Sequence, residues 1–199
     1  MSSEEKSSDE LVDQARRLRN EAHSLLYGKG LLDVVQSAGP TSVIGSYALD
    51  QMTWRDLDMS IQLRHKDDLP GFFEIGRSII NKFQVARMTF NNPVLRPDLP
   101  YDRGYYWGIH ILHAAQTWKV DLWGYGEDDC KKNLENFTRL SERLVDVDRM
   151  AVLRIKNEVC RRPEYRHEVT SLDIYEAIAR HHIRTVEEFD EWLTRRIAG

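Results

Sequence analysis

The chain has 199 residues, with 41% hydrophobic and 30% charged side chains and a formal net charge of -4. This balance excludes a disordered chain, and no apolar run approaches the roughly 20 residues that cross a bilayer, so we expect no membrane partner. The mildly acidic charge argues against broad contacts with phosphates, so we expect a small substrate and no nucleic acid. Residues 1–10 lack the apolar core of a signal peptide, which favours the cytoplasm.

The first part of the chain predicts a long helix that leads into a pair of strands. Ser7 and Glu10 form a capping box, and apolar residues then recur at helical spacing until two glycines end the helix. One or two helical turns over 31–36 precede a first strand that starts at Thr41. A second strand begins at Asp56, and a proline-glycine pair then starts a helix with apolar residues on its buried side.

The middle of the chain predicts three more strands and a long loop. After a strand over 85–90, the stretch 91–104 holds three prolines, two asparagines, two arginines and a glycine, which is typical of an irregular loop. Strand-like composition returns over 105–113, and a strand that carries Asp121 follows after a short turn. These two strands predict an antiparallel hairpin at the edge or the centre of a sheet.

The last third of the chain predicts helices only. Beyond Gly126, apolar residues follow helical spacing in four segments. We therefore expect a core of strands and helices over 1–126 and a helical subdomain over 127–199. Cys130 and Cys160 occupy apolar positions of these helices, so we expect reduced, buried thiols rather than a disulfide or a metal pair.

The strongest functional signal is a turn followed by paired acids. A short apolar strand ends in Gly45-Ser46, where a glycine lets the backbone approach a ligand closely. The second strand then starts with Asp56 and Asp58, which period-two alternation places on one face, opposite the apolar residues of the same strand. Two like charges this close are costly unless a cation lies between them, and hard oxygen ligands favour Mg²⁺ or Mn²⁺.

Gly-Ser, a spacer of about ten residues and Asp-x-Asp in a strand resemble the signature of the polymerase-beta-like nucleotidyltransferase superfamily. The segment 118–123 is similar to a third element of that signature, an acid flanked by apolar residues on a later strand. Alternation sends Lys119 and Asp121 to one face, so Asp121 can join the first two acids from an adjacent strand. The resemblance covers 43–63 and 118–123. It implies an α+β fold, a mixed sheet packed with helices and followed by a helical subdomain.

The resemblance also implies a Mg²⁺-dependent enzyme that moves a nucleoside monophosphate from a nucleoside triphosphate, with ATP as the expected nucleotide, to a hydroxyl of a small molecule. Asp56, Asp58 and Asp121 would be its catalytic residues and the ligands of two Mg²⁺ or Mn²⁺ ions. Gly45 and Ser46 would bind the phosphates of the nucleotide. Lys119 would neutralise phosphate charge.

Within this scheme Asp121 would activate the acceptor hydroxyl. Asp56 and Asp58 are two residues apart and must both hold the metal of the nucleotide, so a carboxylate from another strand is needed to reach the acceptor. The loop over 91–104 comes just before the strand pair that carries Asp121 and contains two arginines. We therefore expect this loop to border the acceptor pocket.

Other interpretations of these residues stay open. The paired acids are also compatible with a solvated strand face, Asp121 with a buried structural carboxylate, and Gly45-Ser46 with an ordinary turn. For the whole chain, the alternatives are an inactive binding or regulatory protein of the antitoxin type, and a nucleotidyltransferase that modifies a protein. The sequence leaves open the identity of the acceptor, the nucleotide and the oligomeric state.

Overall fold

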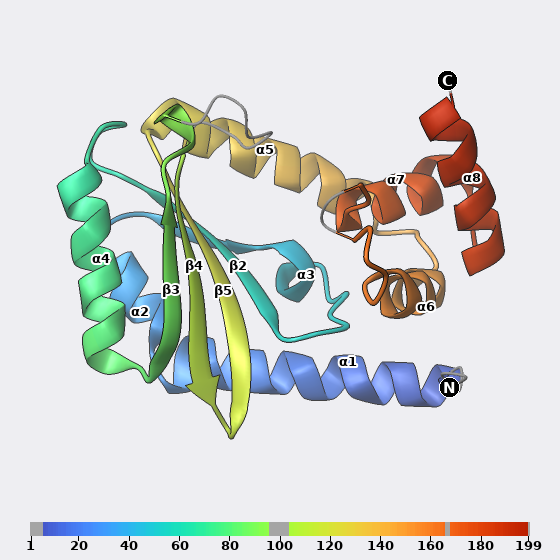
Figure 1. The fold of residues 1–199 in the computed structure, drawn as a ribbon, viewed down its shortest axis with the longest axis horizontal. Coiled ribbons are helices and arrows are strands. Elements are labelled where there is room, and N and C mark those ends of the chain that lie inside the picture. The colour runs from blue at the N-terminus through green and yellow to red at the C-terminus, as the bar shows by residue number, and fades with distance from the viewer. Residues whose placement is uncertain (1–5, 96–103, 166–167, 199) are drawn as a thin grey trace.

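The computed structural model describes residues 6–95, 104–165 and 168–198. Within these ranges, strands form one mixed sheet in the order β1-β2-β5-β4-β3 (Figure 1). Strands β2 and β5 run parallel, and the other neighbouring pairs are antiparallel. The strands are β1 (Thr41–Ile44), β2 (Asp56–Gln62), β3 (Val85–Asn91), β4 (Tyr105–His113) and β5 (Gln116–Tyr125).

Helical segments surround the sheet and extend beyond it. The predicted capping box starts the first of them: Ser7 Oγ accepts a hydrogen bond from the Glu10 amide at 3.3 Å, and the Glu10 carboxylate accepts one from the Ser7 amide at 2.8 Å. The segments are α1 (Ser8–His23), the π-helical η1 (Ser24–Gly28), α2 (Leu31–Gln36), α3 (Gly45–Ala48), α4 (Leu69–Lys82), the 3₁₀ turn η2 (Pro93–Leu95), α5 (Glu127–Arg143), α6 (Arg149–Val159), α7 (Ser171–His181) and α8 (Val186–Ala198).

One face of the sheet forms the main hydrophobic core. Leu57, Met59 and Ile61 of β2 are completely buried there, as the alternation of the strand predicts. Helices α1, α2 and α4 contribute apolar side chains to the same cluster, and Figure 1 shows these helices beside the sheet. Each fully buried aliphatic side chain stabilises the fold by about 1.5–3 kcal/mol, so this face holds the strands rigidly in register.

The opposite face of the same strands carries polar side chains and is crossed by α5. Ser60 of β2 lies against this helix, with its Oγ 3.7 Å from the Cys130 Sγ. Cys130 and Cys160 are free thiols, but both are partly exposed, so the prediction of buried thiols is wrong. The reason is that α5 has no fully buried residue and Cys160 is the C-cap of α6 rather than part of its buried stripe.

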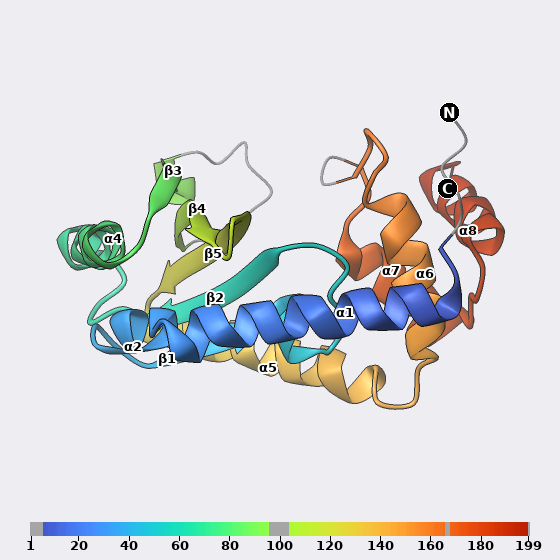
Figure 2. The ribbon, with the colours of Figure 1, turned by 90° about the horizontal axis from the view of Figure 1, so that it is seen from below.

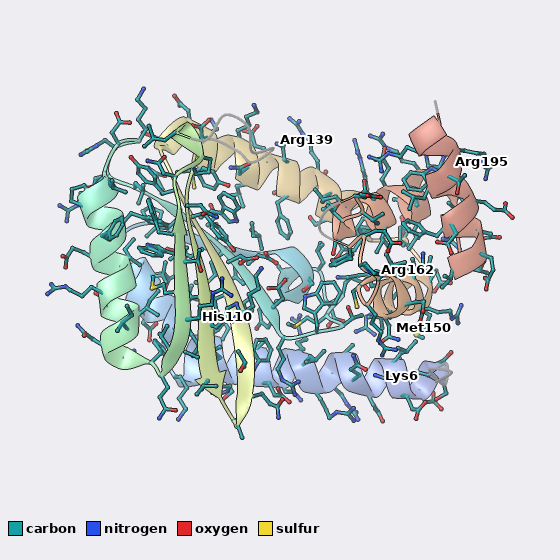
Figure 3. All side chains as sticks on the ribbon, viewed as in Figure 1. Lys6, His110, Arg139, Met150, Arg162 and Arg195 are labelled. Atoms are coloured by element: carbon teal, nitrogen blue, oxygen red, sulfur yellow. The ribbon has the colours of Figure 1, made fainter. Side chains whose placement is uncertain are left out.

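The C-terminal helices α6, α7 and α8 have a second hydrophobic core of their own. Helix α1 connects the two cores, because its N-terminal half packs Leu11 and Ala15 against Leu153 of α6, with Met150 beside them. Figure 2 shows α1 running past the sheet to the C-terminal helices, and Figure 3 shows Met150 on the side of α6 that faces α1. The domain boundary after residue 126 stays a prediction.

The predicted fold class is confirmed. The described residues form an α+β structure in which a mixed sheet is packed with helices and followed by a helical region. In the part of the chain that the structure describes, no helix is both long and apolar enough to cross a membrane.

Candidate functional site

Gly45 directly follows β1 and lies against Asp58 of β2. Its φ is +67°, a left-handed conformation that favours glycine, and a Cβ at this position would collide with the carboxylate of Asp58. The turn expected at Gly45-Ser46 is the start of the short helix α3. Both the conformation and the lack of a side chain therefore bring this backbone against Asp58.

Three carboxylates meet on the polar face of the sheet. Because β2 and β5 are parallel neighbours, Asp58 pairs in register with Asp121, and Asp56 pairs with Lys119. One carboxylate oxygen from each of Asp56, Asp58 and Asp121 can be chosen so that all lie within 4.8 Å of one another. The structure thus brings together the acids that the sequence predicted would share one face.

The cluster has an unfavourable electrostatic environment for three negative charges. The pKa of Asp58 is raised to about 8, first because the side chain is buried and then because the charges of Asp56 and Asp121 repel its own. Lys119 offsets part of this charge: its ammonium group forms an ion pair with Asp121 and lies 3.6 Å from Asp56 Oδ1. Hard oxygen donors crowded in this way are typical ligands for Mg²⁺ or Mn²⁺, so the donor set fits such an ion.

Two adjoining cavities lie at the acids and share Asp56, Asp58, Trp123 and Thr170. The first, of about 330 Å³, includes Gly45 and Ser46 together with apolar side chains of α5 and α7, and we call it the Gly-Ser cavity. The second, of about 420 Å³, includes Lys119, Asp121, Tyr106, Asn91 and Pro93, and we call it the Asp121 cavity. The two predicted groups of site residues therefore face different spaces.

The loop predicted over 91–104 borders the Asp121 cavity through its first residues. Asn91, which is the last residue of β3, and Pro93 line this cavity together with the acids. The remainder of the loop, from residue 96 to residue 103, lies outside the described residues.

Tyr106 is a site residue that the sequence interpretation missed. Its hydroxyl donates a hydrogen bond of 2.6 Å to Asp121 Oδ1. The hairpin register could have revealed it, because the tight turn before Gln116 pairs Tyr106 with Trp123, two residues from Asp121 on the same face.

Lys156 of α6 was also missed. Its side chain is completely buried, and its ammonium group donates 2.9 Å hydrogen bonds to the Gln51 carbonyl and to the Tyr175 hydroxyl. Burial lowers the pKa of Lys156 to about 8, although Asp58 and Asp56 act in the opposite direction. A single lysine in an amphipathic helix gives no sign of this role, because most lysines lie on a solvated face. Lys156 links the C-terminal helices to the segment that leads into β2.

The Arg55 side chain, directly before β2, is directed to α1. Its guanidinium forms hydrogen bonds of 2.8 and 3.2 Å with the carboxylate of Glu21 on α1. This ion pair anchors the start of β2 to the long helix.

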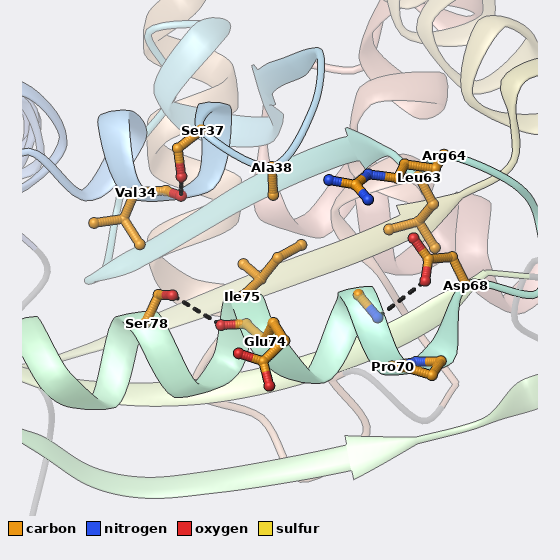
Figure 4. A pocket seen from close by; sticks show the side chains of 11 residues that line it. Val34, Ser37, Ala38, Leu63, Arg64, Asp68, Pro70, Glu74, Ile75 and Ser78 are labelled. Carbon is orange, nitrogen blue, oxygen red and sulfur yellow. Dashed lines mark hydrogen bonds between the residues drawn. The ribbon is translucent and has the colours of Figure 1, made fainter.

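A separate cavity of about 440 Å³ lies between α2 and α4 (Figure 4). None of the three clustered acids lines it. Three of the polar groups in view bond within their own segments: Ser37 to the Val34 carbonyl, Ser78 to the Glu74 carbonyl and the Asp68 carboxylate to the Gly71 amide. Arg64 lines the same cavity.

No protein-family model matches the chain, and no curated protein sequence matches it. Solved structures do match. The structure of the GLD-2/RNP-8 complex aligns with 87% of this chain and 64% of the matched chain, with 15% identity and a TM-score of 0.53. A cytoplasmic RNA terminal U-transferase aligns with 85% of this chain and 53% of its own, with 14% identity and a TM-score of 0.46. The Cid1 poly(U) polymerase aligns with 77% and 47%, with 14% identity and a TM-score of 0.45.

The chain therefore has the fold of the polymerase-beta-like nucleotidyltransferase superfamily, as the sequence motifs indicated. It spans less than two thirds of the length of these matched structures. The predicted partners are contradicted by the comparison. The structural neighbours are RNA terminal polymerases, so the expectation of a small-molecule acceptor and no nucleic acid is wrong. Net charge misled here because it averages the whole surface, whereas an acceptor end needs only a local site.

Proposed function

We propose that this chain transfers a nucleoside monophosphate from a nucleoside triphosphate to a terminal hydroxyl group of an RNA strand. The observation that carries the proposal is the cluster of Asp56, Asp58 and Asp121 beside the left-handed Gly45. This cluster lies in a fold that the chain shares with GLD-2, which supports RNA as the acceptor.

The three acids are proposed to hold Mg²⁺ or Mn²⁺. A divalent ion bound there would neutralise phosphate charge and lower the pKa of the attacking hydroxyl. The raised pKa of Asp58 supports this assignment, because a cation favours the ionised form of a carboxylate that lies beside two others.

The two cavities divide the substrates between them. Of these two cavities, the Gly-Ser cavity is the one that Gly45 and Ser46 line, so we assign it to the nucleoside triphosphate, with ATP as the first candidate. Asp121 lines the other of the two, so we assign the RNA end and its activation to that side. The acceptor hydroxyl gives its proton to Asp121 and its oxygen bonds to the α-phosphorus, while the bond from that phosphorus to the oxygen that bridges the α- and β-phosphates breaks and pyrophosphate leaves.

Lys119 is proposed to neutralise phosphate charge next to the acids. It lines the Asp121 cavity and not the Gly-Ser cavity, and it contacts Asp121 and Asp56. Its charge therefore acts where the acceptor strand and the reacting phosphate meet, rather than at the far end of the triphosphate.

The test is an extension assay with the full chain, Mg²⁺ and a labelled single-stranded RNA, with each of the four nucleoside triphosphates supplied separately. We expect a longer RNA product together with released pyrophosphate. The matched control is Asp56→Asn combined with Asp121→Asn, which keeps the size of both side chains. Nucleotide binding without any transfer would instead favour an inactive, regulatory protein and would contradict the proposal.

A further inference from the structure

The Asp121 cavity has an aromatic wall beside the acids. Tyr106 of β4 and Trp123 of β5 are cross-strand partners, with ring centroids 4.6 Å apart and ring planes at 47°. Trp123 also stacks on Tyr125, with centroids 6.1 Å apart and planes at 10°. Tyr106 and Trp123 are only partly buried and line the cavity beside Asp121.

The same wall is joined directly to Asp121. The Tyr106 hydroxyl donates its 2.6 Å hydrogen bond to this carboxylate by passing over Gly108, which is the cross-strand partner of Asp121. A Cβ on Gly108 would lie 2.7 Å from the Tyr106 hydroxyl oxygen, which is too close. The absence of a side chain at position 108 therefore makes room for the bond between the aromatic wall and the acid.

We propose that Tyr106 forms the subsite for the terminal base of the acceptor RNA strand, and that its hydroxyl holds Asp121 in place for the acceptor hydroxyl. This inference rests on the proposed function and adds the position of the acceptor. Aromatic rings bind single-stranded RNA by stacking, because every base presents a π-face whatever its identity.

The position of Tyr106 favours the acceptor base over the base of the nucleotide, and the cavity volume and Asn91 are compatible with a stacked base there. Tyr106 lines the Asp121 cavity and not the Gly-Ser cavity. The volume of about 420 Å³ suits one terminal nucleotide better than a length of strand. Asn91 lines the same cavity, and its amide can both donate to and accept from the edge of a stacked base.

The ring and the hydroxyl of Tyr106 then have separable roles. Tyr106→Phe keeps the stacking surface and removes the bond to Asp121, so it should leave the KM for RNA unchanged and lower kcat by about tenfold or more. Tyr106→Leu removes the stacking surface as well, so it should also weaken RNA binding by about tenfold or more. Neither change should alter the affinity for the nucleoside triphosphate, because Tyr106 does not line the Gly-Ser cavity.

The experiment measures the affinity of the full chain for a labelled single-stranded RNA by fluorescence anisotropy, without nucleotide. It compares the unchanged chain with Tyr106→Phe, Tyr106→Leu and the control Tyr27→Leu, which removes a half-exposed tyrosine from η1, outside both cavities. A second RNA carries an abasic terminal nucleotide. The unchanged chain should bind the abasic RNA as weakly as Tyr106→Leu binds the intact RNA. The two proteins should have the same affinity for the abasic RNA.

Equal affinity of Tyr106→Leu and the unchanged chain for the intact RNA would overturn the subsite. A loss of affinity that is the same for the intact and the abasic RNA would also overturn it, because it would reflect a general change in the protein. An unchanged kcat in Tyr106→Phe would overturn the positioning role. If RNA binding depends on Tyr106 and on the terminal base but no nucleotide is transferred, the subsite stands and the proposed function fails.

Discussion

Strands β2 and β5 present two faces built from alternate residues of the same segments. On one face, Leu57, Met59 and Ile61 are completely buried against helices, and local pattern and packing agree. On the other, Asp56, Asp58 and Asp121 crowd together at a cost that is visible in the raised pKa of Asp58. The apolar face therefore supplies the stability that allows the polar face to hold three carboxylates close together.

The largest expected effect comes from removing the charges of the acidic face. Asp56→Asn together with Asp58→Asn should abolish Mg²⁺-dependent nucleotide binding, because both proposed ligands on β2 are lost. The fold should remain intact or become slightly more stable, since repulsion between like charges is removed. Isothermal titration with nucleotide and Mg²⁺ measures the loss of binding, and thermal melting measures the stability of the fold. Unchanged nucleotide affinity would contradict the metal site.

A substitution on the apolar face should instead lower stability and leave the affinity for metal and nucleotide unchanged. Leu57→Ala removes a fully buried side chain between the two acids in sequence and should lower the free energy of unfolding by about 3 kcal/mol. Denaturant unfolding measures this loss. The affinity for Mg²⁺ and nucleotide of the folded fraction should stay close to that of the unchanged chain, and a selective loss of metal binding would show that the two faces are not independent.

Asp121→Asn tests whether Asp121 and Asp56 have different roles within the acidic face. If Asp121 serves the acceptor side, this variant should retain nucleotide binding and lose turnover by about 10²-fold or more. Asp56→Asn should instead weaken both. Steady-state extension kinetics, with nucleotide affinity measured separately, distinguish the two patterns. A wild-type rate in Asp121→Asn would make that carboxylate structural.

The smallest expected effect is a pH dependence of stability without metal. The folded-state pKa of Asp58 is raised to about 8, well above the unfolded value of about 3.9, so the folded chain binds a proton that the unfolded chain has released. Stability should therefore fall as the pH rises between these values. The melting temperature measured in EDTA should decline as the pH rises through this interval. Asp58→Asn should flatten the decline, and an identical pH profile in both proteins would contradict it.

Sequence patterns predicted the elements of this fold well because most of them depend on local signals. The capping box at Ser7, the strand from Tyr105 and the alternation around Asp58 each involve residues within a few positions of one another. The meeting of Asp58 and Asp121 came instead from the family resemblance, since no local signal says which strands are neighbours.

What the sequence did not reveal depends on contacts between distant segments. Tyr106 reaches Asp121 only through the register of the hairpin and the bare backbone of Gly108. Lys156 becomes a buried group only because α6 packs against the segment of Gln51. The apolar lining of the Gly-Ser cavity likewise comes from the packing of α5 and α7, which periodicity does not specify.

Helix α1 has a mechanical consequence for the whole molecule. Its first half packs on α6 and its second half packs in the core of the sheet, so a single rod of about 24 Å, from 16 residues at about 1.5 Å each, spans both bodies. A hinge that swung the C-terminal helices away from the sheet would have to strip Leu11 and Ala15 from Leu153. Helix α1 thereby sets the distance between the sheet and the C-terminal helices. A motion that widens the space between them to admit or release a substrate must slide these helices along α1 or detach one end of α1.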